Sequence, residues 1–144
     1  MIKGKKLYLP ITSKNICHAY ELLLANGLVS FPLTQEGVGK VEAIVANINN
    51  PYFGVEIYET IEEKAVAFLY FLIKDHPFID GNKRIGAYIF IWFLRQSGIL
   101  DISRILTPSA LTALTLLVAE SDPRYKEKMI QLVLTMLVIK NKKK

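Results

Sequence analysis

The sequence lacks several features that would point to an oxidising or membrane environment. It contains a single cysteine, Cys17, so no disulfide can form within the chain, as is typical of proteins from the reducing cytosol. Its first residues carry no apolar signal segment. No apolar run approaches the ~20 residues that a membrane-spanning helix needs. These absences predict a cytoplasmic protein that makes no use of a membrane.

The residues that are present predict one globular domain over residues 1–144. Chains of this length bury enough surface to fold without a disulfide or a structural metal, and 51% of the residues are hydrophobic. The net charge is +5, and much of it lies in a basic tail, residues 140–144. No aromatic residues alternate with these lysines, so we interpret the tail as a solvated end. Nucleic acid is therefore not an expected partner of this domain.

Apolar residues recur with helical spacing along most of the chain. The clearest start signal is the capping box formed by Thr60 and Glu63. The segment Ile85 to Leu94 is apolar on all sides, and we expect it to be a central buried helix. The fold class predicted is all-α, a compact bundle of about six helices. They are expected at about 13–25, 38–48, 61–75 and 82–97, with two more starting at Thr107-Pro108 and at Asp122-Pro123.

A polar loop interrupts this apolar pattern. It reads HPFIDGNKRIG, from His76 to Gly86, and it joins AVAFLYFLIK to AYIFIWFL. Gly81 and Asn82 fall where the fourth helix should begin, so free N–H groups and the helix dipole favour an anion there. Glycine allows a ligand to approach the backbone closely, and Lys83 and Arg84 add two cations. The pattern predicts a phosphate-binding site.

Two further residues of this loop extend the prediction. A carboxylate next to bound phosphate is unfavourable unless Mg²⁺ bridges the two, so Asp80 is a candidate metal ligand. His76 lies four residues earlier and is suited to act as a general base on an attacking hydroxyl. The competing interpretation is that Asp-Gly-Asn only forms a turn. The combination of all these residues at one helix start favours the binding site.

The string His-Pro-Phe-x-Asp-Gly-Asn-Lys-Arg resembles the signature loop of the Fic/Doc (Fido) family. Members of this family are small all-α domains that transfer part of a nucleotide, usually ATP, to a hydroxyl of a target protein. A longer stretch, YETIEEKAVAFLYFLIKDHPFIDGNKRIGAYIFIWFL together with LTALTLLVAESDP, also resembles the Fic domain of RhuM-type virulence-associated proteins. That resemblance is compatible with this chain being one domain of a longer protein.

The resemblance implies a role for each matching residue. His76 corresponds to the catalytic base and Asp80 to the Mg²⁺ ligand. Asn82 and Arg84 correspond to phosphate-binding residues, helped by backbone N–H groups near Gly81. ATP and Mg²⁺ are thus the implied cofactors. The implied partner is a target protein with an acceptor Ser, Thr or Tyr hydroxyl.

Two other segments take their expected roles from the same resemblance. Phe78 corresponds to a buried residue that anchors the loop in the core. The segment Tyr52 to Tyr58 contains Gly54 and alternates weakly, which is typical of a loop or a short hairpin. It lies where the family places a β-like flap that aligns the target backbone by strand-like pairing.

The loop also departs from one branch of the family. Enzymes that transfer AMP usually have glycine where this chain has Lys83, and a second arginine where it has Ala87. The Doc branch shares the Asn-Lys-Arg and lacks the second arginine, although Gly81 is the Fic-like residue. We therefore favour a Doc-like kinase that transfers the terminal phosphate of ATP. Transfer of AMP (adenylylation, or AMPylation) is the alternative.

A catalytically silent protein-interaction module is a further alternative. It would be expected to have lost the signature residues, and all of them are present. The inhibitory motif of the family is Ser or Thr, three residues, Glu, then Gly or Asn, and this sequence does not contain it. Any such inhibition would have to come from another chain, such as an antitoxin, or from a domain missing here.

Overall fold

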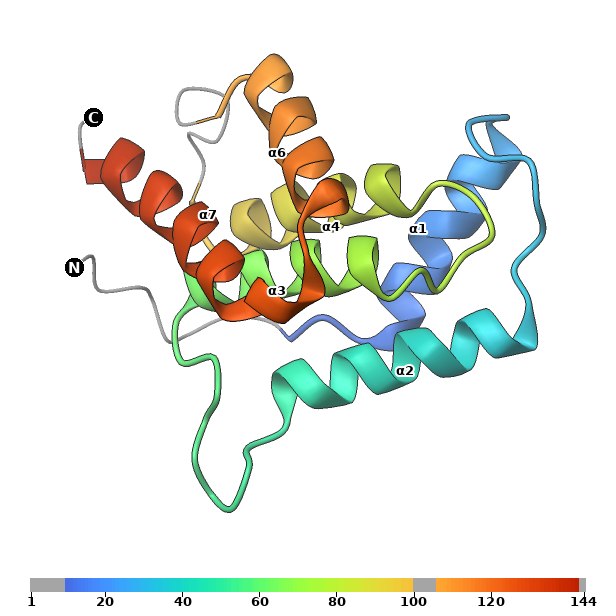
Figure 1. Cartoon of the computed structure of the whole chain (residues 1–144). Coiled ribbons are helices and arrows are strands. Elements are labelled where there is room, and N and C mark those ends of the chain that lie inside the picture. Colours follow the sequence, from blue (N-terminus) through green and yellow to red (C-terminus); the bar gives the residue numbers. More distant parts are fainter. Residues whose placement is uncertain (1–9, 100–105, 143–144) are drawn as a thin grey trace.

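The fold is all-α, as the sequence predicted. The computed structural model describes residues 10–99 and 106–142. Within these ranges the chain forms six α-helices and no strand, and a short 3₁₀-helix, η1, precedes the last of them (Figure 1). No helix in these ranges is both long and apolar enough to cross a membrane. The helices are α1 (Ser13–Ala25), α2 (Gln35–Asn49), α3 (Ile61–Lys74), α4 (Asn82–Gln96), α6 (Pro108–Glu120) and α7 (Lys126–Lys142), with η1 at Pro123–Tyr125.

Capping side chains set most helix starts. The capping box at Thr60 is present, because its hydroxyl accepts the N–H of Glu63 while the Glu63 carboxylate accepts the N–H of Thr60. The start of α2 was predicted near Val38, and this was wrong by about one turn. The Thr34 hydroxyl accepts the N–H of Gly37, so the helix begins at Gln35. It therefore includes Gly37 and Gly39, although glycines are more typical of a loop.

The central helix is α3, not the Ile85 to Leu94 segment that the sequence suggested. Nearly all of α3 is buried, because α2, α4, α6 and α7 all pack against it (Figure 1). In contrast, α4 buries only one face. Tyr88 is exposed and Trp92 is only partly buried, since both line a pocket of about 170 Å³ between α4 and α1.

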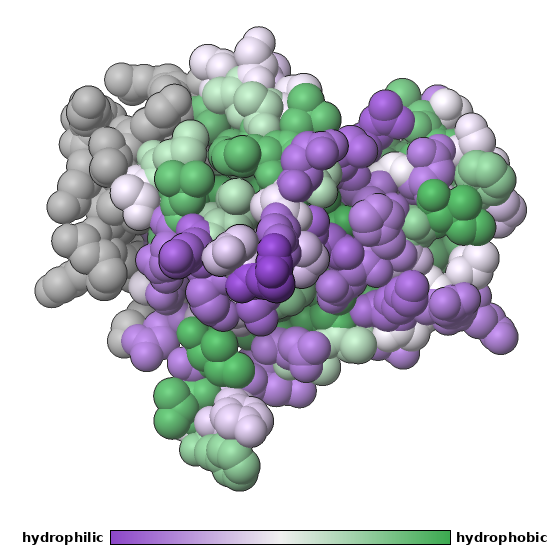
Figure 2. Space-filling model, viewed as in Figure 1, coloured by the Kyte–Doolittle hydropathy of each residue, from purple (hydrophilic) through white to green (hydrophobic). Residues whose placement is uncertain are grey.

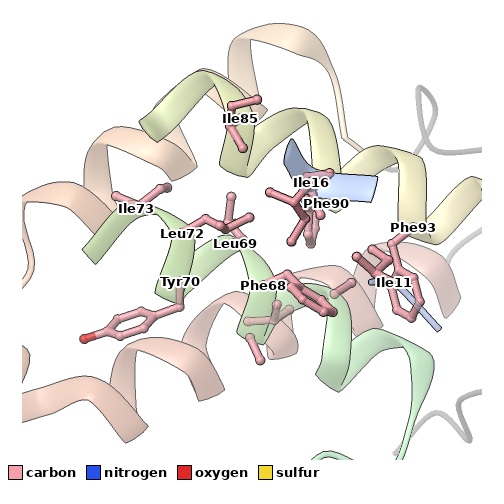
Figure 3. Packing of buried hydrophobic residues seen from close by; sticks show 14 of the residues in the cluster. Ile11, Ile16, Phe68, Leu69, Tyr70, Leu72, Ile73, Ile85, Phe90 and Phe93 are labelled. Atoms are coloured by element: carbon pink, nitrogen blue, oxygen red, sulfur yellow. The ribbon is translucent and has the colours of Figure 1, made fainter. Parts of the chain in front are cut away.

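The core is formed mainly where α3 meets α4 (Figure 3). Phe90 and Phe93 of α4 are both 0% exposed, and the ring of Phe93 lies edge-on to that of Phe68, with 6.0 Å between ring centroids. Gly86 allows this close approach. A Cβ atom there would lie 3.1 Å from Ile73 and 3.5 Å from the carbonyl oxygen of Leu69. Tight packing of these two helices fixes the position of the loop between them.

The predicted flap is a tight turn that projects from the bundle between α2 and α3. The backbone N–H and C=O groups of Tyr52 and Val55 bond to each other, at 2.8 and 3.0 Å. The two residues between them, Phe53 and Gly54, both have positive φ, as in the two-residue hairpin turns. Figure 2 shows this projection as a largely apolar surface. Phe53 at its tip is 87% exposed.

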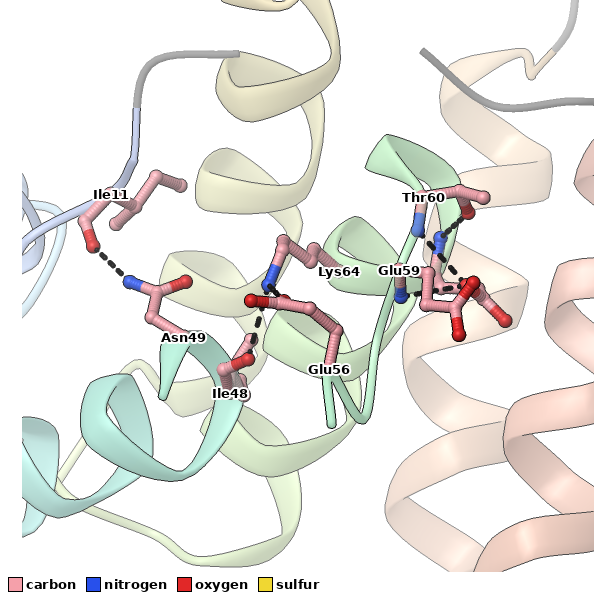
Figure 4. A network of polar contacts seen from close by, with 8 residues as sticks. Ile11, Ile48, Asn49, Glu56, Glu59, Thr60 and Lys64 are labelled. Atoms are coloured by element: carbon pink, nitrogen blue, oxygen red, sulfur yellow. Dashed lines mark hydrogen bonds and ion pairs between the residues drawn. The ribbon is translucent and has the colours of Figure 1, made fainter. Parts of the chain in front are cut away.

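A buried lysine connects the flap to the bundle (Figure 4). Lys64 of α3 is 1% exposed, and its ammonium donates to the carbonyl oxygen of Ile48, at 3.2 Å. It also pairs with the carboxylate of Glu56 at 3.4 Å. A buried cation needs such partners because burial removes its hydration. The pair therefore holds the return arm of the flap against α3 and the end of α2.

Candidate active site

The signature loop connects the two helices that form the centre of the core. The segment between the two helices runs from Asp75, the C-cap of α3, to Gly81, the N-cap of α4, and the remainder of the signature string, from Asn82 onward, belongs to the start of α4. Gly81 adopts the left-handed conformation, with φ +84°, and no side chain caps the first turn of α4. Glycine suits this φ, and a Cβ atom at this position would collide with Val29. The first N–H groups of α4 are thus left without a side-chain cap, which is the geometry that binds anions.

Asn82 and Phe78 give the loop its shape. The side-chain amide of Asn82 accepts the N–H of Phe78 at 2.9 Å and donates to its carbonyl oxygen at 2.8 Å. Asn82 is 8% exposed. Phe78 is buried as expected, and its ring stacks on Tyr20 of α1, with 4.3 Å between centroids. The Asn82 side chain is therefore already engaged within the loop, and a phosphate contact by this residue stays a prediction.

The link between α1 and α2 packs against the start of α4. We call its residues Leu28–Ser30 the strap. The backbone N–H of Ser30 lies 3.4 Å from a carboxylate oxygen of Asp80, and the carbonyl oxygen of Leu28 accepts from the Arg84 guanidinium. Val29 is buried between these contacts, against Gly81. The structure thus brings Asp80, Gly81 and Arg84 together, and the strap holds them.

His76 occupies a strained position at the opening of the loop. Its φ is +49°, in the left-handed region that residues other than glycine seldom adopt. Its side chain is exposed, and Nδ1 lies 3.3 Å from the carbonyl oxygen of Lys74. When Nδ1 carries the proton, it donates to this carbonyl and leaves Nε2 as the acceptor. That tautomer is the one a general base needs.

Lys83 and Arg84 line one side of a pocket of about 310 Å³ between α4 and α6. Both residues are exposed on the first turn of α4. The wall across from them is mainly aliphatic, with two hydroxyl groups. A pocket with cations at one end and an apolar wall is suited to a ligand with a charged part and an apolar part. The lining residues are Lys83, Arg84, Ala87, Leu111, Thr112, Thr115 and Leu116.

The side chains around Asp80 suit a metal ion that takes only some of its ligands from the protein. Among residues 10–99 and 106–142, no group of three or more His, Cys, Asp or Glu side chains is placed to hold a metal ion. A complete protein cage is therefore not formed by these residues. A single carboxylate beside a phosphate site is what Mg²⁺ needs when phosphate oxygens and water supply its other ligands. The residues present fit that cation.

Sequence reasoning missed the contacts that reach the loop from α1 and α2. Gly37 lies so close to the loop that a Cβ atom there would be 2.6 Å from the carbonyl oxygen of Pro77. Tyr20 donates its hydroxyl to the carbonyl oxygen of Phe31, at 2.6 Å. Burial, with smaller effects from Asp80 and Glu21, raises the pKa of the Tyr20 hydroxyl, so it stays protonated and can donate. A local motif carries no signal for such distant neighbours.

Cys17 is not a candidate nucleophile. Burial is the largest cause that raises the pKa of its thiol, and the nearby carboxylates of Glu42 and Glu21 raise it further. A raised pKa leaves little of the reactive thiolate at neutral pH. The cysteine is therefore best understood as a packing residue of α1.

Comparison with known proteins gives two matches. The sequence model described as the Fic/DOC family matches residues 10–94, which is more than half of the chain and extends from α1 through α4. A similar curated protein is Toxin Doc from Mycolicibacterium smegmatis, which is 34% identical over 82 residues. That alignment covers 55% of this chain and 62% of the relative, so the chain spans less than two thirds of the relative's length. No solved structure matches.

Proposed function

The chain belongs to the Fic/DOC family, and on this premise we propose that it is an enzyme that transfers part of Mg-ATP to a hydroxyl side chain of a target protein. The observation that carries the proposal is the uncapped start of α4. It is flanked by the cations of Lys83 and Arg84 and by the carboxylate of Asp80. Transfer of phosphorus groups depends mainly on positioning and on stabilisation of charge, and this arrangement supports both.

Each residue has a distinct task in the proposed reaction. The N–H groups at the start of α4, with Lys83 and Arg84, bind the phosphates and offset their negative charge. Asp80 would hold Mg²⁺, which supplies neutralisation of phosphate charge when bound. His76 takes the proton of the acceptor hydroxyl through Nε2. Asn82 keeps the loop in the shape that places these groups together.

We favour transfer of the terminal phosphate over transfer of AMP. An AMP-transferring site needs a second group that binds the outer phosphates, and Ala87 cannot supply it where AMP-transferring members of the family usually have an arginine. Ala87 lines the pocket between α4 and α6, and Lys83 supplies a cation at the same place. Similarity to a relative named Toxin Doc supports the same choice. In the pose that we propose, the apolar wall of α6 receives the nucleoside.

The flap is proposed to hold the target protein. Its turn is fixed by the Tyr52–Val55 bonds and by the Glu56–Lys64 pair, so it offers a preformed edge for strand-like pairing. The apolar side chains of Tyr52, Phe53, Val55 and Ile57 are all exposed there. We expect a target segment with apolar residues on either side of its hydroxyl. Because a similar protein is named a toxin, we also propose that an antitoxin or a further domain restrains the activity.

The test of this proposal uses ATP labelled separately at the α- and γ-phosphates. The purified chain is incubated with each label, Mg²⁺ and a bacterial lysate, and labelled proteins are resolved on a denaturing gel. Label from γ-labelled ATP alone is expected. Label from α-labelled ATP alone would replace phosphate transfer with AMP transfer. No label on any protein with either nucleotide would contradict an enzymatic function.

Asp80→Asn should remove the metal-dependent part of ATP binding. The amide keeps an oxygen that can accept from the Ser30 N–H, so the loop is preserved, but it is a far weaker Mg²⁺ ligand than a carboxylate. Calorimetry should show that Mg²⁺ strengthens ATP binding to the wild-type chain. The same addition of Mg²⁺ should change ATP binding to the variant only slightly. In a chelator the two should bind ATP similarly.

The matched control is Asp75→Asn, at the other end of the same loop. It removes one negative charge without touching the proposed metal ligand. This variant should retain the wild-type response to Mg²⁺. If Asp80→Asn retains it as well, the assignment of Asp80 as the metal ligand is wrong.

A further inference from the structure

The strap places a hydroxyl side chain of the protein itself beside the proposed phosphate site. Ser30 is exposed, and its backbone N–H lies 3.4 Å from the Asp80 carboxylate. Because this contact uses the N–H, it does not occupy the hydroxyl. The remainder of the strap contacts Gly81 and Arg84, so Ser30 is held at the start of α4 and not merely near it.

Contacts on both sides of Ser30 limit its movement. On one side, Val29 is buried against Gly81, and the carbonyl of Leu28 accepts from Arg84. On the other side, the carbonyl oxygen of Phe31 accepts the Tyr20 hydroxyl at 2.6 Å, and the Tyr20 ring stacks on Phe78 of the loop. A serine held in this way is presented to the site at a high effective concentration, which favours reaction within the chain.

We propose that Ser30 is an acceptor for the group that this site transfers, so that the chain modifies itself. This rests on the proposed function, since it needs Mg-ATP bound at the start of α4. The Ser30 Oγ forms a bond to the γ-phosphorus, and the bond from that phosphorus to the oxygen of the leaving ADP breaks. The hydroxyl proton passes to Nε2 of His76 and then to water. Nothing is oxidised or reduced.

A phosphoryl group on Ser30 would interfere with binding of another ATP phosphate at the start of α4. This group would lie on the strap, two residues from the carbonyl that now binds Arg84, and arginine binds phosphate in a fork geometry. It also adds negative charge next to Asp80, which disfavours a second nucleotide phosphate there. Modification is therefore expected to stop at one group per chain and to weaken further ATP binding.

The experiment uses the purified full chain with Mg²⁺ and γ-labelled ATP, and no lysate. Label should appear on the chain, and peptide mass spectrometry should locate one phosphoryl group at Ser30. The first-order rate constant should be the same at a low and at a high chain concentration, because the reaction is intramolecular. Ser30→Ala should lose the label, and Ser30→Thr should keep it because it keeps a hydroxyl.

Ser109→Ala is the matched control, since Ser109 is an exposed serine near the start of a different helix, α6. It should be labelled like wild type. If the separate lysate assay described above labels lysate proteins while the purified chain gains no label on Ser30, this inference is overturned and the proposed function stays intact. Label on another residue of the chain, or a rate constant that rises with chain concentration, would overturn it too. No label on the chain or on lysate proteins from either γ- or α-labelled ATP would overturn both proposals.

Discussion

Replacement of His76 by Asn should lower the rate of transfer to the target protein by about 10²–10⁴-fold, the usual contribution of a general base. Asparagine tolerates the left-handed conformation that His76 adopts better than most residues do, so the loop should keep its shape. What is lost is the Nε2 lone pair that accepts the hydroxyl proton. Binding of ATP should persist, because the proposed function assigns the phosphates to the start of α4 and not to His76. Labelled-ATP transfer and calorimetry on the same preparation measure the two effects.

The chain contains one other histidine, His18, which provides the control. It lies on α1 and lines the pocket between α1 and α4. His18→Asn should transfer label at the wild-type rate. Undiminished transfer by His76→Asn would exclude His76 as the base. Loss of both transfer and ATP binding in that variant would instead indicate a collapsed loop, which circular dichroism and a thermal melt would reveal.

Replacement of Phe90 by Ala should reduce the free energy of unfolding by about 3–5 kcal/mol. The ring is 0% exposed and points from α4 into the core (Figure 3). Its removal costs the transfer free energy of the ring and leaves a cavity, because α3 and α4 are already packed too closely to collapse further at Gly86. Urea denaturation should show a lower midpoint with a similar slope, and the melting temperature should fall by roughly 10 °C or more.

Tyr88→Ala, two residues earlier on the same helix, is the control for this prediction. Its ring is exposed, so its removal should cost about 1 kcal/mol or less. Trp92 should give an intermediate value because it is only partly buried, although the purely apolar sequence around it suggests a fully packed ring. If Phe90→Ala and Tyr88→Ala lower the free energy of unfolding equally, the assignment of one buried face to α4 is wrong.

Helices were predictable wherever a local signal marks their ends. The capping box at Thr60 and the Thr107-Pro108 start are read from a few adjacent residues, and both are present. The position of α3 at the centre was not predictable in the same way. It contains the charged residues Glu62 and Lys64, which a periodicity argument assigns to the surface, yet both are buried. Burial depends on which helices pack against α3, and that information is not local.

The same distinction applies to the candidate site. The polar loop and its place at a helix start could be read from the sequence, because they depend on adjacent residues. The strap could not, because its contacts with Asp80 and Arg84 join residues 50 and 56 positions apart. The hydrogen bonds of the Asn82 side chain within the loop could not be predicted either. A side-chain amide can hydrogen-bond to a phosphate as well as to the backbone, so the residue type does not decide between them.

The long span of the strap contacts has a consequence for the order in which the molecule assembles. Contacts between residues so far apart close a large loop of chain. The loss of chain entropy on closure opposes these contacts until enough of them form together. The α3–α4 hairpin is local by comparison, and we expect it to form first. The candidate site would then be completed only when α1 docks, late in folding. Detachment of α1 would in turn dismantle the site while the packed α3–α4 pair stays folded, and amide exchange should detect such an opening as a separate low-energy step.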